Sequence, residues 1–217
     1  MKYSFISLEG IDGTGKSTIV EKIAREITKV GGEPYLTRDP VRNVEPWRRL
    51  YGVFEKSEKI DKLSEALLLL SSRIDNSRKR LKPSLARGET IVADRFHDSW
   101  FAYQSIRLSD HFGDERKALD YLVSQHQSLV DQGILLEPDR TFLLRVNPEI
   151  SMKRVNERTT EITKSKYDIL EFQKKVSNQY DIIANMFKDR IIVIDTENKN
   201  LEKVSEEVMG VLGFAQH

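Results

Sequence analysis

Short hydrophobic runs alternate along the chain with stretches in which apolar residues recur every three or four positions. The runs predict strands at residues 3–8, 34–37, 90–93, 141–146 and 191–194. The periodic stretches predict helices at residues 19–30, 63–81, 95–107, 114–131, 169–187 and 201–212, with a short one over 147–158. We expect the helix over 63–81 to end before Pro83, because proline disfavours helical geometry in the residue that precedes it.

This alternation predicts the fold class. Strands separated by helices form parallel sheets with helices on both faces, so we expect an α/β fold with a five-stranded parallel sheet, in a single domain over residues 1–217. Ligands of such sheets gather at the carboxyl ends of the strands. Residues 159–166 break the pattern, because they are rich in Thr and Lys and have no apolar period. We expect this segment to be mobile.

The composition excludes several classes of protein. The 35 Lys and Arg against 34 Asp and Glu give a net charge of +1, and therefore no overall field that attracts nucleic acid. Cysteine is absent, which excludes disulfides and thiolate metal sites and fits a reducing compartment. The longest purely apolar stretch, residues 66–70, is far too short to cross a membrane. We expect a cytoplasmic protein that binds neither nucleic acid nor membrane.

A glycine-rich segment between the first strand and the first helix carries the strongest chemical signal. It has the pattern G-x-x-x-x-G-K-[ST] of a phosphate-binding P-loop, formed here by Gly10, Ile11, Asp12, Gly13, Thr14, Gly15, Lys16 and Ser17, with Thr18 next. Glycines let the backbone N–H groups and the positive helix end point at phosphate oxygens. Lys16 is placed to reach the β- and γ-phosphates of ATP, and Ser17 to bind the bridging Mg²⁺. A P-loop NTPase fold follows.

Two strands end in an aspartate of the kind that orients a metal ion, Asp94 and Asp195. Asp94 is followed directly by Arg95, which places a cation for phosphoryl oxygens beside an anion for Mg²⁺ at one strand end. We therefore favour Asp94, which can also cap the following helix. Asp195 is interpreted as a plain strand-end residue.

The residues around these positions resemble the thymidylate kinase family. The likeness extends over nearly the whole chain and is carried by residues 8–17 (LEGIDGTGKS), 37–40 (TRDP), Arg73 with 81–85 (LKPSL), 94–104 (DRFHDSWFAYQ), and the pair Arg154 and Arg158. The pattern D-R-[FY]-x-x-S-x-x-A-Y-Q is the most specific of these. The resemblance implies transfer of a phosphoryl group from Mg²⁺-bound ATP to dTMP, giving ADP and dTDP for dTTP synthesis. It also implies a homodimer and a lid over about residues 158–168.

The resemblance assigns roles to individual residues. Donor-side roles fall to Arg154 in ATP binding and to Lys16, Arg95 and Arg158 as catalytic cations. Acceptor-side roles are Asp12 for the 3′-hydroxyl, Arg73 for the thymine edge, Arg38 with Arg49 or Arg48 for the phosphate, Arg95 beside it, and Tyr103 for excluding ribose, on a helix face with Ser99 and Gln104. Two alternatives remain open, in which Asp12 only forms the turn and Tyr103 is ordinary core.

Three positions depart from the family's pattern. Leu69 stands where a Phe usually stacks on thymine, and Val41 and Arg42 replace a glycine pair. Gly13 stands where many members carry a catalytic arginine, which leaves the lid, with Arg158 helped by Lys164 or Lys166, to supply that charge.

Other functions share some of these features. A deoxynucleoside kinase has a P-loop but needs a carboxylate base to activate a neutral 5′-hydroxyl, for which Glu9 is the nearby candidate. Another deoxynucleoside-monophosphate kinase is a related alternative. A catalytically weak nucleotide-binding regulatory protein is the alternative from a different class, suggested by Leu69 and the sparse lid.

Overall fold

The structure is a computed structural model that describes residues 3–56, 60–157 and 170–214 of the chain. Its centre is a sheet of five parallel strands in the order β2-β3-β1-β4-β5. The strands are β1 (Phe5–Glu9), β2 (Pro34–Arg38), β3 (Thr90–Asp94), β4 (Arg140–Arg145) and β5 (Ile191–Asp195). The predicted five-stranded parallel sheet is confirmed, and each strand end lies within two residues of its predicted position.

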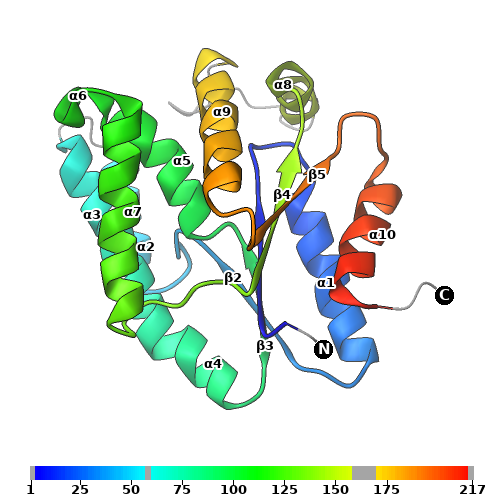
Figure 1. The fold of residues 1–217 in the computed structure, drawn as a ribbon. Helices are drawn as coiled ribbons and strands as arrows, with labels where there is room; N and C mark the ends of the chain where they lie inside the picture. Colours follow the sequence, from blue (N-terminus) through cyan, green and yellow to red (C-terminus); the bar gives the residue numbers. More distant parts are fainter. Residues whose placement is uncertain (1–2, 57–59, 158–169, 215–217) are drawn as a thin grey trace.

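Helices cover both faces of this sheet (Figure 1). One face carries α1 (Lys16–Lys29) and α10 (Leu201–Leu212). The other carries α2 (Trp47–Lys56), α3 (Lys62–Asn76), α4 (Lys82–Ala86), α5 (His97–Arg107), α6 (Ser109–Phe112), α7 (Glu115–Asp131) and α9 (Leu170–Met186). The short α8 (Pro148–Asn156) lies beyond the carboxyl end of β4.

The two faces bury different helical surfaces. On the first face, α1 presents Ile19, Ile23 and Ile27 at four-residue spacing, each at most 1% exposed, to the sheet. On the second face, α5 packs against both α7 and α9, and Trp100 and Phe101 are buried among them. Because α5 directly follows β3, its burial fixes the side chains at that strand end.

The helix expected over residues 63–81 runs further than predicted. It continues from α3 through a π-helical segment, η1 (Ser77–Leu81), into α4, and therefore passes Pro83. In a regular α-helix the proline ring meets the carbonyl four residues earlier. Here the Lys82 N–H donates to the Ser77 carbonyl, so the wider π turn changes that spacing. The prediction that this helix ends before Pro83 was wrong.

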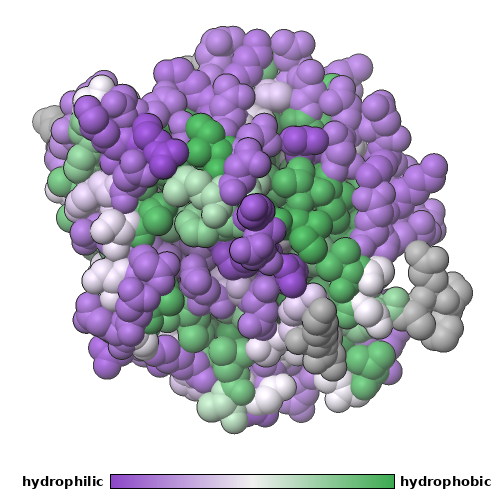
Figure 2. Space-filling model, in the orientation of Figure 1, coloured by the Kyte–Doolittle hydropathy of each residue, from purple (hydrophilic) through white to green (hydrophobic). Residues whose placement is uncertain are grey.

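The surface in Figure 2 is mostly hydrophilic, with hydrophobic side chains gathered between α9 and α10, where the edge strand β5 reaches the surface. Val193 of β5 and Leu201 of α10 are both 38% exposed. None of the helices within the described ranges combines the length and apolar character needed to cross a membrane.

Candidate active site

Three neighbouring strands end together at one edge of the sheet. In the sheet register, Leu8 of β1 and Arg38 of β2 both lie opposite Asp94 of β3. The segments that follow these strands therefore start side by side. This is the edge at which parallel sheets bind ligands.

The glycine-rich loop after β1 fits closely against its surroundings. Gly10 has φ +133°, and a Cβ there would overlap the carbonyl oxygen of Leu144. Gly13 has φ +79°, and a Cβ there would lie 2.8 Å from the carbonyl oxygen of Ser151. Both positions need glycine for conformation and for space. The Ser151 hydroxyl also donates to the Asp12 carbonyl, so α8 braces the loop.

Lys16 is held inside this loop. Its Nζ donates to the Ile11 carbonyl at 2.7 Å, and the side chain is buried. Burial, with the nearby Arg95, lowers the pKa of Lys16 to about 7, although the charges of Asp12 and Asp94 act in the opposite direction. The ammonium group is thus poorly compensated, and phosphate oxygens would compensate it.

Ser17 and Asp94 form the contact between the loop and β3. Ser17 Oγ donates to Asp94 Oδ2 at 2.7 Å, while the buried Oδ1 has no hydrogen-bond partner among the described residues. Hydroxyl and carboxylate oxygens are ligands that Mg²⁺ prefers, so the pair fits that ion. Asp195 lies elsewhere, half-exposed on the edge strand and 3.6 Å from Arg145.

Arg95 connects the loop to α5. Its φ of 69° lies in the left-handed region, which is uncommon for a residue with a side chain, and α5 begins only two residues later, at His97. Nη2 donates to Asp12 Oδ1 at 2.6 Å, Nη1 donates to Ser99 Oγ at 3.2 Å, and the guanidinium lies 5.5 Å from the Tyr103 ring centre. Burial alone would raise the pKa of Asp12, but the charges of Arg95 and Lys16 lower it overall.

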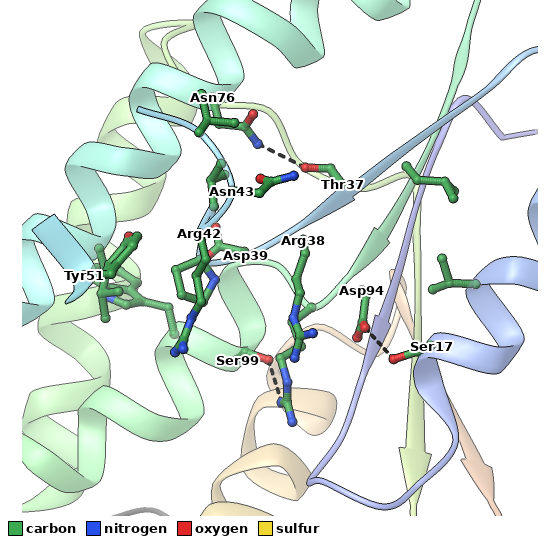
Figure 3. A pocket seen from close by; sticks show the side chains of 18 of the residues that line it. Ser17, Thr37, Arg38, Asp39, Arg42, Asn43, Tyr51, Asn76, Asp94 and Ser99 are labelled. Atoms are coloured by element: carbon green, nitrogen blue, oxygen red, sulfur yellow. Dashed lines mark hydrogen bonds between the residues drawn. The ribbon is translucent and has the colours of Figure 1, made fainter. Parts of the chain in front are cut away.

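A cavity of about 820 Å³ opens beside these residues, within the size range of small-molecule sites. The predicted site residues that line it are Asp12, Ser17, Arg38, Asp94, Arg95, Ser99, Tyr103 and Gln104. Figure 3 shows Arg38, at the end of β2, and Arg42, in the segment after it, extending into this space near the Ser17–Asp94 pair.

The cations at the β2 side of the cavity differ from those expected. Arg38 and Arg42 are exposed and line it. Arg48 and Arg49 instead lie next to Glu45, at 2.7 and 3.4 Å, and neither is among the described residues that line the cavity. The structure therefore brings Arg42 to the site and does not bring Arg48 or Arg49.

Arg73 is fully buried and lies behind the cavity wall. Its Nε and Nη2 donate to the two carboxylate oxygens of Asp39 at 2.6 and 3.1 Å. The guanidinium lies between the rings of Phe96 and Trp100, 5.6 and 5.1 Å from their centres. Arg73 Nη1 has no hydrogen-bond partner among the described residues. Asp39 and Trp100, rather than Arg73, are the members of this group that line the cavity.

The wall next to this group is largely apolar. Leu69 and Trp100 line it, and the Trp100 indole N–H donates to the Ala66 carbonyl at 3.1 Å, which fixes the ring. Gln104 is 3% exposed, and its Oε1 has no partner among the described residues. This wall therefore offers flat apolar contact together with one amide.

Glu9 does not face the cavity. It is buried, accepts hydrogen bonds from the Phe96 N–H at 2.6 Å and the Tyr180 hydroxyl at 3.2 Å, and contacts Ser99 Oγ at 2.5 Å. Burial, with the neighbouring Asp98 carboxylate, raises the pKa of Glu9 to about 8. Glu9 is not one of the described residues that line the cavity. Glu9, the candidate base for a deoxynucleoside kinase, is therefore not presented to a substrate in the cavity.

Other predicted site residues either are not among the described residues that line the cavity or lie outside the described ranges. Arg158 and the lid over residues 158–168 lie outside the described residues. Arg154 is half-buried on α8, the helix that braces the loop, and Thr18 is exposed on the first turn of α1.

Sequence reasoning missed Arg42 and Trp100. Arg42 was recognised only as a departure from the family's glycine pair. Trp100 carried a usable signal, because it lies three and four residues before Tyr103 and Gln104 and therefore shares their helix face.

Comparisons with known proteins agree with this geometry. A model of the thymidylate kinase family matches residues 8–208. A probable thymidylate kinase of Methanosarcina mazei is 31% identical over 100% of this chain and 98% of its own length. A thymidylate kinase of Clostridium novyi is 32% identical over 97% and 98%. The crystal structure of thymidylate kinase from Ehrlichia chaffeensis matches with a TM-score of 0.70 and 27% identity, over 96% of this chain and 97% of that one. This chain therefore belongs to the thymidylate kinase family.

Proposed function

We propose that this protein transfers the γ-phosphoryl group of ATP to the 5′-phosphate of dTMP, giving ADP and dTDP. The observation that carries the proposal is the position of Arg95. Its guanidinium contacts Asp12 of the P-loop and lies over Tyr103 in the cavity wall. One cation is thus placed between a phosphate-binding loop and a nucleotide-sized cavity.

The P-loop supplies the donor site in this proposal. Its backbone N–H groups and the N-terminus of α1 bind phosphate oxygens. Lys16 exchanges its contact with the Ile11 carbonyl for the β- and γ-phosphates. Ser17 and Asp94 would hold Mg²⁺, which would supply positive charge for the phosphate oxygens of ATP.

The cavity supplies the acceptor site. Arg38 reaches the 5′-phosphate from the end of β2, Arg42 from the segment after it, and Arg95 from the position that follows β3. Asp12 accepts a hydrogen bond from the 3′-hydroxyl. Tyr103 crowds the 2′ position, and the base lies against Leu69 and Trp100, with Gln104 at its polar edge. Arg73, held by Asp39, supports this wall from behind. Its contact with the thymine edge remains a prediction from the resemblance.

The chemistry needs alignment and charge neutralisation more than proton transfer. The acceptor is already an anionic phosphate oxygen, so no strong base is required. The bond from that oxygen to the γ-phosphorus forms as the bond to the β-bridging oxygen breaks, and ADP leaves with the electron pair. Lys16 and Arg95 stabilise the negative charge that is shared between the γ-phosphoryl group of ATP and the 5′-phosphate of dTMP. A lid over residues 158–168 that carries Arg158 completes the proposal by excluding water.

A panel of acceptors tests this proposal. The purified full chain with Mg·ATP is given dTMP, dUMP, the other deoxynucleoside monophosphates, thymidine or no acceptor, and ADP release is followed. We expect the fastest turnover with dTMP and little without an acceptor. Lys16→Ala, purified in the same way, controls for contaminating kinases. Preferred turnover of thymidine, or ADP release that does not depend on an acceptor, would overturn the proposal. The homodimer and the cytoplasmic location remain predictions from the sequence.

A further inference from the structure

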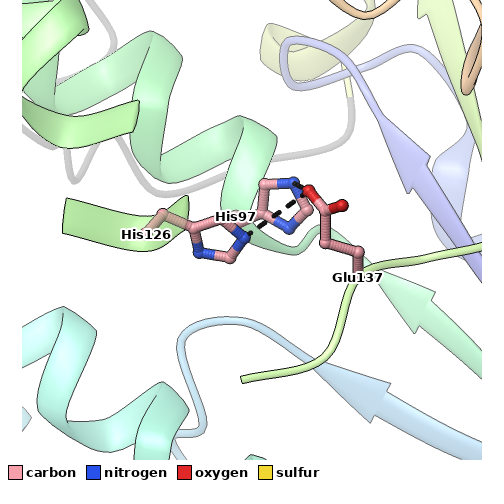
Figure 4. A group of neighbouring side chains, drawn as sticks. All are labelled: His97, His126 and Glu137. Carbon is pink, nitrogen blue, oxygen red and sulfur yellow. Dashed lines mark ion pairs between the residues drawn. The ribbon is translucent and has the colours of Figure 1, made fainter. Parts of the chain in front are cut away.

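Two buried histidines and a carboxylate meet away from the cavity, where three parts of the chain converge (Figure 4). His97 begins α5, His126 lies in α7, and Glu137 belongs to the segment that leads into β4. The two imidazole rings are stacked, with centres 4.1 Å apart and planes 23° apart. The exposed fractions of the side chains are 0%, 2% and 33% respectively. Glu137 alone of the three has appreciable contact with solvent.

The polar atoms of this group are not satisfied by the fold. None of the four ring nitrogens has a hydrogen-bond partner among the described residues. Buried polar atoms without partners are rare in folded proteins, because such an atom loses its hydrogen bonds to water and gains none in return. The two Nε2 atoms, which both face Glu137, therefore indicate a missing partner that they can share.

The surrounding charges favour a cation as that partner. The charged groups that act on the three side chains are Asp98, Asp131, Arg190 and Arg73. Arg190 is held by Asp98 through contacts of 2.7 and 2.8 Å, and Arg73 is held by Asp39. Both guanidinium groups are thus compensated, whereas the Glu137 carboxylate has only the two imidazoles as partners among the described residues.

The histidines themselves do not provide the positive charge. Burial lowers the pKa of both His97 and His126, with further lowering from Arg190 and Arg73, so both rings are neutral. Burial also raises the pKa of Glu137, as expected for a carboxylate without a cationic partner. Neutral imidazole is the form that binds metal ions.

We propose that His97, His126 and Glu137 bind one divalent transition-metal ion of the zinc type. Both Nε2 atoms lie 3.8 Å from Glu137 Oε1, and the three donor atoms all lie within 4.8 Å of one another. Donors at zinc-like bond lengths around a tetrahedral ion are about 3.4 Å apart. Binding therefore requires the three donors to move closer together and the stacked imidazole rings to rotate, so that both Nε2 lone pairs point at the ion. Two nitrogens and one oxygen suit zinc, cobalt or nickel and not Mg²⁺, which takes oxygen ligands.

Such an ion would tie together α5, α7 and the entry to β4. His97 lies two residues after Arg95, so the ion would brace the helix that carries Ser99 and Tyr103 without contacting the substrates. The ion would therefore have a structural role and no catalytic one. The proposal does not depend on the proposed kinase activity, because binding is measured without nucleotide.

Titration of the full chain with Co²⁺ or Zn²⁺ tests this site directly. Millimolar Mg²⁺ is kept present so that the Ser17–Asp94 oxygens are occupied by their preferred ion. We expect one Zn²⁺ per chain by calorimetry, and visible Co²⁺ absorption without thiolate bands, since the chain has no cysteine. We also expect the melting temperature to rise by roughly 5–10 °C at a hundredfold excess of free Zn²⁺ over Kd.

Three variants locate the binding. Glu137→Gln and His126→Gln should each lose the high-affinity Zn²⁺ and the melting shift. His111→Gln, at an exposed histidine 3.1 Å from Asp61, should keep both and is the matched control. If His126→Gln does not fold, Glu137→Gln decides, because Glu137 is one-third exposed and outside the helices. Absence of saturable Zn²⁺ binding in the natural chain, or unchanged binding in Glu137→Gln, would overturn the proposal.

Discussion

The proposed donor and acceptor sides of the site are built differently. The proposed donor side is one continuous loop that enters α1 and is joined by Asp94 of β3. The acceptor side takes its walls from the segment after β2, from α3 and from α5. Arg95 stands between the two sides, in contact with Asp12 and with Ser99.

This contrast between a continuous loop and a cavity built from several segments shows which roles can be assigned from residue type alone. In the loop, much of the binding comes from the backbone, so the glycine spacing largely determines what it can do. In the acceptor cavity, neighbouring side chains decide which atoms face a ligand. Arg73 illustrates this, because Asp39 and the Trp100 ring hold its guanidinium behind the wall.

The largest effect is expected from the donor side. Lys16→Ala should lower kcat by about a thousandfold or more, since it removes the cation that neutralises the transferred phosphate. The circular dichroism spectrum should stay unchanged. Lys29→Ala, at the exposed end of the same helix, should retain activity. Near-normal turnover of Lys16→Ala would show that the loop is not the donor site.

On the acceptor side, the largest effect should come from the buried ion pair. Asp39→Asn leaves the Arg73 charge uncompensated, which should lower the free energy of unfolding by about 3–5 kcal/mol. The melting temperature should fall by roughly 10 °C. Asp195→Asn removes a half-exposed partner of Arg145 and should change stability by less than about 1 kcal/mol. If Asp39→Asn and Asp195→Asn lowered the free energy of unfolding by equally small amounts, Asp39 would not be what holds Arg73.

The pH dependence of donor binding distinguishes the two sides further. Since the pKa of Lys16 is lowered to about 7, free protein loses this charge above pH 7, and phosphate binding should restore it. Mg·ATP should bind about tenfold more weakly at pH 8 than at pH 6, with uptake of about 0.9 proton at pH 8.

Calorimetry in buffers of different ionisation enthalpy measures this uptake. Lys16→Arg keeps its charge at both pH values and should take up no proton from this position. dTMP binding, which does not engage Lys16, should show no comparable uptake. Uptake that persists in Lys16→Arg would assign the proton to another group.

The smallest effect concerns the base. Leu69→Phe should improve kcat/KM for dTMP by roughly threefold, because an aromatic face would add stacking at the position where Leu69 offers aliphatic contact. The KM for ATP should not change. Leu67→Phe, at a position 41% exposed on the same helix, is the control. A loss of activity with dTMP in Leu69→Phe would mean that the base lies elsewhere in the cavity.

The sequence allowed much of the fold to be predicted, because hydrophobic periodicity follows strands and helices directly. The path through Pro83 could not be predicted, since a single π turn between Ser77 and Lys82 accommodates it. The short helix α2, which contains Gly52, was also missed.

The site was predictable where one motif holds the residues together. The P-loop and the family were identified from contiguous residues, and the family assignment is confirmed. Which arginine lines the acceptor side depends on the course of the chain after β2, so Arg48 or Arg49 was predicted and Arg42 was not considered for that role. The stacking of His97 on His126 arises from the packing of α5 on α7, and no spacing in the sequence indicates it.

In the proposed complex, ATP and dTMP bind with their phosphates meeting between Lys16 and Arg95. A crystal structure with Mg²⁺, a non-hydrolysable ATP analogue and dTMP measures this directly. We predict the γ-phosphate of the analogue at the P-loop and the dTMP phosphate beside Arg95, both at the carboxyl ends of β1 and β3. Either phosphate group bound away from these strand ends would contradict the account.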